Sequence, residues 1–254
     1  MVLIYEKKDK VAYITINRPR VMNAMDAETF QRLGEAIREV DRDPEVWVAI
    51  VTGAGDKAFT SGADLKGYIG REVEGPGEPY SMYEFYKLIP SIKPFIAAIN
   101  GYCLAGGLEL ALSCDIRIAS ENASFGCPEV RWGVLHGYGA LRLPRMIPMA
   151  EAMELLLIGD RIDAQKALRL GLVSRVVPQD QLMPTAEAIA HRICENAPLS
   201  VRVTKELAHR GAQMPHSEGL HLVHTLMAQL YATEDSKEGP RAFAEKRKPN
   251  YRAQ

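Results

Sequence analysis

Glu109 is the only charged residue in the stretch "PFIAAINGYCLAGGLELALSC" (94–114). It follows Gly106 and Gly107, where a predicted strand gives way to a helix, so it falls in the first helical turn. The helix dipole favours an ionised carboxylate there, yet the apolar flanks predict burial, which is costly for a charge that nothing uses or pairs. Glu109 is therefore a candidate catalytic acid or base.

Two further stretches carry groups suited to the same chemistry. Glu129 follows Pro128 in "ASFGCPEVRWG" (123–133), where a solvated turn residue is the simpler interpretation if the stretch is taken alone. The stretch "FTSGADLKG" (59–67) is a second glycine turn, with a possible helix start at Asp64. Amides at a helix start lack internal acceptors and can bind an anion, and glycine lets a ligand approach the backbone closely.

Alternating strand and helix signals must position these groups. Apolar residues over 27–40 recur at the spacing of one helix face, and Asp26 can cap the start of that helix. Strands are expected over the β-branched and apolar segments 11–17, 46–53, 94–100, 115–120 and 171–177. The order predicts an α/β core of repeated units with buried strands.

The second part of the chain changes in composition. After Pro178 the sequence is rich in helix formers, with periodic stretches near 180–196, 198–211 and 217–233 before a charged end. This pattern predicts a helical C-terminal region. The Gly-, Pro- and Glu-rich segment 70–82 is expected to form a surface loop that could cover a pocket.

Composition narrows the function classes. Lys plus Arg number 31 against 32 Asp plus Glu, so no overall positive field attracts nucleic acid or anionic lipid. Pro and Gly divide the apolar stretch 94–114, which argues against a membrane span. The first residues lack the apolar run of an export signal, and the four cysteines show no C-x-x-C spacing. We therefore expect a cytoplasmic protein, with an organelle matrix as the alternative if a transit peptide was removed.

Together, the motifs resemble those of the crotonase, or enoyl-CoA hydratase/isomerase, superfamily, and most closely its two-glutamate hydratases. They occur in the family's order and span nearly the whole chain: "NRP" (17–19), "NAM" (23–25), "SGADLK" (61–66), "AAINGYCLAGGLELALSCD" (97–115), "SFGCPEVRWG" (124–133) and "AFAEKRKPNY" (242–251). The resemblance implies a spiral of β-β-α units over 1–195. It also implies a helical region over 196–254 that forms trimers, paired into hexamers, and completes the CoA site.

The resemblance also assigns the chemistry. The family's oxyanion hole, two backbone N–H groups, corresponds to Ala63 and Gly106, and its water-holding pair to Glu109 and Glu129. The implied reaction is hydration of a trans-2-enoyl-CoA, with Glu109 activating water and Glu129 exchanging the proton at the α-carbon. Coenzyme A is then part of the substrate, and no cofactor, metal, nucleic acid or membrane partner is expected.

Substrate contacts are expected along the glycine turn, in the stretch after Glu129 and in the tail. The candidates are Ser61, Gly62, Ala63, Asp64, Leu65, Lys66, Gly137, Tyr138 and Lys246. For the two lysines a solvated surface charge is an alternative interpretation. Where hydratases usually have Pro-Gly and small residues, this chain reads "LHGYGALRLPR" (135–145). Tyr138 could narrow the acyl pocket, contact a polar acyl group, or point away and pack beside Trp132.

Other reactive side chains have structural interpretations. A lone loop histidine such as His136 is more often a structural hydrogen-bonder, and the pair in "HLVH" (221–224) lacks a third metal ligand. Cys127 has no histidine base at a recognisable position. An isomerase, a racemase or a hydratase for unusual acyl groups remains open within the family. Outside enzymes, an RNA-binding homologue or a structural assembly protein remains an alternative.

Overall fold

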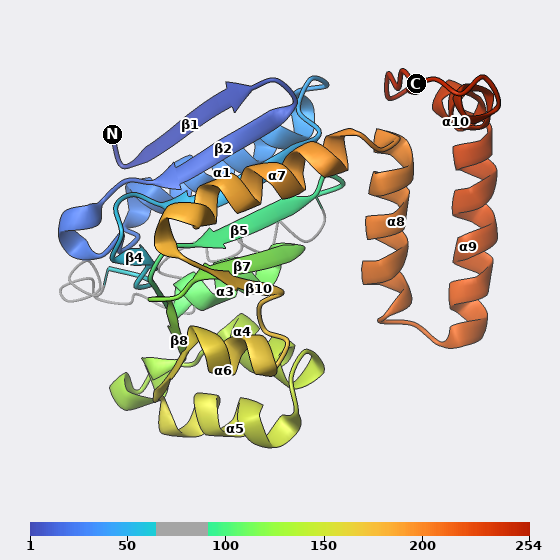
Figure 1. Ribbon diagram of the computed structural model, residues 1–254. Coiled ribbons are helices and arrows are strands. Elements are labelled where there is room, and N and C mark those ends of the chain that lie inside the picture. Colours follow the sequence, from blue (N-terminus) through green and yellow to red (C-terminus); the bar gives the residue numbers. More distant parts are fainter. Residues whose placement is uncertain (65–90) are drawn as a thin grey trace.

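The computed structural model describes residues 1–64 and 91–254, and two sheets organise them (Figure 1). The larger sheet has the order β1 (Leu3–Lys8), β2 (Val11–Ile16), β3 (Val48–Gly53), β5 (Phe95–Ile99), β7 (Ile116–Ser120) and β10 (Arg175–Val177). The smaller sheet has the order β4 (Ala58–Thr60), β6 (Tyr102–Leu104), β8 (Ser124–Gly126) and β9 (Arg161–Asp163).

From β3 to β8, consecutive strands alternate between the two sheets. β3, β5 and β7 join the larger sheet in parallel, and the strand after each, β4, β6 or β8, joins the smaller sheet, also in parallel. Only β1 with β2 and β8 with β9 pair antiparallel among the described strands. Each turn of the chain therefore adds one strand to each sheet, which is the spiral that the sequence resemblance implied.

Helices cover both faces of the larger sheet, which explains why every residue of β3 and β5 is buried. On one face lies α1 (Ala27–Arg42), whose buried residues include Phe30, Leu33, Ile37 and Val40. On the other lies α7 (Leu182–Cys194), which packs Leu182, Ala186 and Ala190 against the sheet. The Thr29 amide donates to Asp26 Oδ1 at 2.9 Å, so the predicted cap of α1 is confirmed.

Some elements differ from the sequence-based expectation. The segment predicted as a strand over 171–177 is strand only in β10, because Gly171 takes φ +75° and turns the chain. The short helices α4 (Gly137–Arg142), α5 (Met149–Ile158) and α6 (Ala164–Arg169) were not predicted. They follow α3 (Gly106–Ser113) and lie beside the smaller sheet (Figure 1). The expected loop over 70–82 falls outside the described residues.

The predicted helical C-terminal region consists of α8 (Pro198–Gly211), α9 (His216–Tyr231) and α10 (Glu234–Ala244). In Figure 1, α8 and α9 run side by side, and the three helices extend from the body as an arm. Buried polar contacts attach the arm to the body, because Lys205 and His209 of α8 both contact Asp115. No helix of the described part of the chain is long and apolar enough to cross a membrane.

Candidate active site

Residues from distant parts of the chain line one pocket of about 190 Å³ near the start of α3. Five of the predicted site residues, Ser61, Ala63, Gly106, Glu109 and Glu129, line it. The other lining residues are Ala105 and the mostly apolar set Pro128, Trp132, Val134 and Leu135.

The two amides predicted to form an oxyanion hole come from adjacent segments. Gly106 is the first residue of α3, so its N–H has no acceptor within the helix. Ala63 forms a parallel bridge with Met25 in which the Met25 amide donates to Gly62 and the Asp64 amide donates to Met25. The Ala63 N–H is not used by that bridge, because alternate groups of an extended strand point to opposite sides.

Close backbone packing holds these segments together. Gly62 has φ +96°, and a Cβ on it would lie 2.7 Å from Ala105 Cβ and 3.1 Å from the Gly106 nitrogen. A Cβ on Gly107 would lie 2.4 Å from the Thr60 carbonyl oxygen. Glycine is required at both positions, at Gly62 also for its φ. Ala105, which precedes α3, takes φ 52° and ψ −130°, a conformation that is strained for a residue with a Cβ.

Glu109 is buried, with 1% of its surface exposed. Its Oε1 accepts hydrogen bonds from the Tyr138 amide at 2.7 Å and the Gly139 amide at 3.2 Å, both in the first turn of α4. Burial raises the pKa of Glu109, while the nearby His136 and these two amides partly oppose the rise. The carboxyl group is therefore a better proton acceptor than a solvated glutamate.

Glu129 lies in the 3₁₀ helix Pro128–Trp132, and His136 contacts its carboxylate. Nδ1 of His136 contacts Oε1 of Glu129 and lies 3.9 Å from Oε1 of Glu109. The imidazole thus lies next to both carboxylates. The remaining oxygens, Oε2 of Glu109 and Oε2 of Glu129, are buried and make no hydrogen bond to a described residue. Each glutamate has one anchored oxygen and one oxygen left for a ligand in the pocket it lines.

The predicted CoA-binding residues do not all lie at the pocket of the two carboxylates. Asp64 forms an ion pair with Arg18 at 3.2 Å, while Leu65 and Lys66 lie outside the described residues. Gly137 and Tyr138 begin α4, and it is the Tyr138 backbone that reaches Glu109. The buried Tyr138 side chain hydrogen-bonds to Ser113, whereas Trp132 is 69% exposed. Neither Gly137 nor Tyr138 lines the pocket of the carboxylates.

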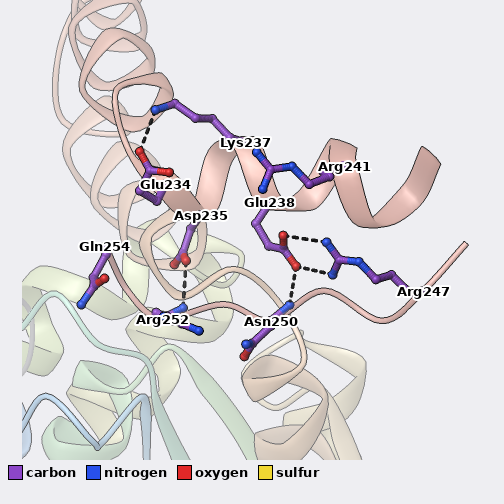
Figure 2. Close-up of a pocket in the computed structure, with 9 residues that line it drawn as sticks. All are labelled: Glu234, Asp235, Lys237, Glu238, Arg241, Arg247, Asn250, Arg252 and Gln254. Atoms are coloured by element: carbon purple, nitrogen blue, oxygen red, sulfur yellow. Dashed lines mark hydrogen bonds and ion pairs between the residues drawn. The ribbon is translucent and has the colours of Figure 1, made fainter. Parts of the chain in front are cut away.

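Lys246 is exposed and follows α10 closely in sequence. α10 lies at the far end of the arm from α3 and α4 (Figure 1). Figure 2 shows a second cavity, of about 460 Å³, between α10 and the C-terminal tail. Its charged groups pair with each other: Glu238 contacts Arg247, Lys237 contacts Glu234, and Asp235 accepts the Arg252 amide at 2.8 Å. These contacts fold the tail back onto α10, so the cavity is explained as a structural clamp.

Comparison with known proteins identifies the family. Residues 6–254 match the family model described as enoyl-CoA hydratase/isomerase. The chain belongs to this family. It is 44% identical over 261 residues to the (E)-benzylidenesuccinyl-CoA hydratase of Thauera aromatica, covering 99% of each protein. It is 41% identical over 260 residues to the short-chain-enoyl-CoA hydratase of Clostridium acetobutylicum, covering 97% of this chain and 95% of that protein.

Solved structures in the family confirm the crotonase-type fold. The crystal structure of an enoyl-CoA hydratase from Bacillus anthracis superposes with a TM-score of 0.96, at 37% identity and with complete coverage of both chains. The match includes the spiral of two sheets and the helical C-terminal region. The expected family and fold are thus both confirmed.

Sequence reasoning missed part of this family member's site. The apolar wall of Trp132, Val134 and Leu135 was not predicted, although the three residues follow Glu129 closely in sequence. His136 was interpreted as a structural hydrogen-bonder, but the sequence did not predict which residue it contacts. Its departure from the family's proline was the available signal. Within residues 1–64 and 91–254, no group of three His, Cys, Asp or Glu side chains is arranged to hold a metal ion.

Proposed function

We propose that this protein is an enoyl-CoA hydratase that adds water to a trans-2-enoyl-CoA and gives a 3-hydroxyacyl-CoA. The observation that carries the proposal is the pair Glu109 and Glu129, which line one pocket with Gly106 and each keep one oxygen without a partner among the described residues. Double-bond migration needs only one acid, whereas two carboxylates can hold a water between them. The arrangement therefore favours hydration over isomerisation.

In the proposed reaction, the amides of Ala63 and Gly106 bind the thioester oxygen. Glu109 accepts a proton from water as the water oxygen bonds to the β-carbon, and the displaced electron pair moves through the α-carbon to the thioester oxygen. Glu129 then delivers a proton to the α-carbon. Fixed donors stabilise the charge that develops on the oxygen, and one such donor can contribute about 10²- to 10³-fold in rate.

The proposed role of Glu109 as the base agrees with its buried environment. Burial raises the pKa of Glu109, which brings this proposed base closer to neutral working pH. The negative charge of Glu129 adds to this rise, because a nearby like charge disfavours the ionised form of Glu109.

The pocket wall supports an apolar acyl group. Pro128, Trp132, Val134 and Leu135 line the pocket, and Trp132 and Leu135 remain 69% and 76% exposed. These exposed side chains extend the apolar surface beyond the carboxylates, so a bulky or aromatic acyl group has a surface to contact. Relatives carry names that span crotonyl, short-chain and benzylidenesuccinyl substrates.

The CoA portion is proposed to lie along 61–66, with the phosphates near Lys66. Lys246 would reach this CoA only from a neighbouring subunit, since it follows α10, which lies far from α3 in the same chain (Figure 1). We propose a homo-oligomer, a trimer or a dimer of trimers. Exposed apolar side chains on the arm, Leu220, Met227, Tyr231 and Phe243, support this. The four free cysteines agree with a reducing cytoplasm.

The experiment measures the loss of the conjugated enoyl-thioester absorbance. The substrates are enoyl-CoA thioesters whose acyl groups range from crotonyl to branched, aromatic and polar. Mass spectrometry identifies the product. Glu129→Gln should lower kcat by about 10²- to 10⁴-fold, because general acid–base catalysis contributes that much. Glu121→Gln, an exposed turn residue, is the matched control and should keep full activity. Wild-type turnover by Glu129→Gln would contradict the assignment, and a shifted double bond as the product would identify an isomerase.

A further inference from the structure

His136 is a buried ionisable residue to which the proposed reaction assigns no role. It precedes α4 and is 2% exposed. The groups that face its ring are Glu129 from the 3₁₀ helix Pro128–Trp132 and Glu109 from α3. It does not line the pocket, so it contacts the carboxylates from behind. Any effect of His136 on substrate must therefore act through the glutamates.

The fold makes specific room for this ring. A Cβ on Gly139 would lie 1.9 Å from both Cδ2 and Nε2 of His136, so only glycine at 139 permits the observed ring position. The Gly139 amide also donates to Glu109 Oε1. One glycine thus serves both the imidazole and the carboxylate next to it.

The contacts determine which ring nitrogen donates. Nε2 is buried and makes no hydrogen bond to any described residue, so a proton placed only there would be buried without an acceptor. Nδ1 contacts the Glu129 carboxylate oxygen. A neutral ring therefore carries its proton on Nδ1, and Nδ1–H donates to Oε1 of Glu129.

We propose that His136 is a positioning residue: its Nδ1–H holds Oε1 of Glu129, which leaves Oε2 of Glu129 as the oxygen that exchanges a proton with the substrate. This inference rests on the proposed function, because it gives Glu129 the proton transfer. Glu109 is held by backbone amides at its own Oε1, so the two glutamates are fixed in the same manner by different groups. Where hydratases of the family have proline, this chain supplies a side-chain donor.

Two substitutions separate positioning from packing. In His136→Asn, the amide nitrogen is as many bonds from Cβ as Nδ1 is in histidine, so the donor to Glu129 is retained. In His136→Gln, the same amide is one bond further out and the donor is displaced. A displacement of about 1 Å near the reacting groups can cost about 10²-fold. We expect His136→Gln to lower kcat by about that factor, with KM little changed, and His136→Asn to recover most of it.

A double-mutant cycle provides the second readout. In the Glu129→Gln background, His136→Gln should lower kcat no further, because the group it positions has already been removed. Melting temperature and affinity for a saturated acyl-CoA are measured for every variant. If His136→Gln does not unfold cooperatively, His136→Ala replaces it with the same expectation, since it removes the donor without adding bulk.

The outcomes separate the two proposals. Wild-type kcat in His136→Gln, equal losses in the Asn and Gln variants, or additive losses in the cycle would overturn the positioning role while Glu129→Gln remains inactive. Full turnover by Glu129→Gln would instead overturn the proposed function itself. A large kcat loss in His136→Gln, recovery in His136→Asn and no further loss in the double variant would support both.

Discussion

Lys205 Nζ lies 2.8 Å from Oδ2 of Asp115, and the contact joins the helical arm to the larger sheet. The exposed fractions of the two side chains are 7% and 16%. His209 Nε2, one turn further along α8, lies 2.9 Å from Oδ1 of the same carboxylate. Burial alone would raise the pKa of Asp115, but the contacts from His209 and Lys205 outweigh it and hold that pKa below its usual value.

Lys205→Met is expected to destabilise the protein by about 1–3 kcal/mol, because it removes a charged hydrogen-bond partner of Asp115, while His209 and the Phe95 amide still contact that carboxylate. Urea unfolding at neutral pH measures this loss. Lys237→Met on α10 is the matched control, since Lys237 and Glu234 form an exposed pair, and its unfolding midpoint should not change measurably. A similar unfolding midpoint in both variants would show that the contact between Lys205 and Asp115 contributes little to stability.

The same variant should alter the acid response. Because the folded-state pKa of Asp115 is lowered, its contribution to stability is present above the unfolded value of 3.8 and is lost as the pH falls through the folded value. The difference in unfolding free energy between wild type and Lys205→Met should therefore narrow as the pH falls below 3.8. A constant difference would assign the effect to packing of the lysine chain.

Glu109→Gln is expected to gain stability over wild type as the pH rises. The pKa of Glu109 is raised, so the stability due to its protonated form is complete below the unfolded value of 4.5 and is lost as the pH rises through the folded value. Gln stays neutral and can still accept the Tyr138 and Gly139 amides through Oε1. The melting temperature of Glu109→Gln minus that of wild type should increase as the pH rises. A difference that falls as the pH rises would contradict the direction of this shift.

Ala105→Gly is expected to stabilise the protein by about 1 kcal/mol, because glycine relieves a backbone conformation that costs a Cβ-bearing residue about 1–3 kcal/mol. Ala212→Gly provides the comparison, since Ala212 has ordinary helical dihedrals, φ −66° and ψ −10°. The Ala212→Gly variant should be slightly less stable than wild type, because glycine adds conformational freedom to the unfolded chain. Equal losses in the two variants, measured by chemical unfolding, would argue against strain at Ala105.

Gly107→Ala is expected to lower kcat/KM by about 10²-fold, because its Cβ would displace the start of α3 from Thr60 and move the Gly106 amide. Gly211→Ala is the control, since its Cβ would find its nearest atom, Leu207 Cδ1, at an ordinary 3.9 Å. Initial hydration rates compare the two, with circular dichroism to verify folding. Unchanged kinetics in Gly107→Ala would show that the position of α3 is not critical.

Local patterns were sufficient to predict much of the fold. The apolar face of α1, its Asp26 cap and most strands of the larger sheet follow from residue spacing, because burial on both faces demands continuous apolar runs. β1 was missed because its second half, "EKK", is exposed at the sheet edge and carries no apolar alternation. The short helices α4 and α5 pack on neighbouring helices, and α6 packs on the smaller sheet. Sequence periodicity does not express such contacts.

The candidate site shows the same division. Ser61, Ala63, Gly106, Glu109 and Glu129 were predicted by family motifs, and all line one pocket. The role of His136 depends on three segments meeting in space, and on the space that Gly139 leaves for its ring. No local spacing encodes such a contact. Its one sequence signal was a departure from the family pattern.

The first turn of α3 has consequences for how charge is shared in the site. Gly106 opens this helix and Glu109 lies in its first turn. In the proposed reaction, one helix terminus therefore acts on both the thioester oxygen and a carboxylate. The terminus carries the equivalent of roughly half a positive charge. The helix dipole stabilises an ionised Glu109. Once Glu109 has taken a proton from water, the same dipole is available to stabilise the negative charge that reaches the thioester oxygen. Proton uptake by the base and charging of the oxygen thus favour each other through a single dipole.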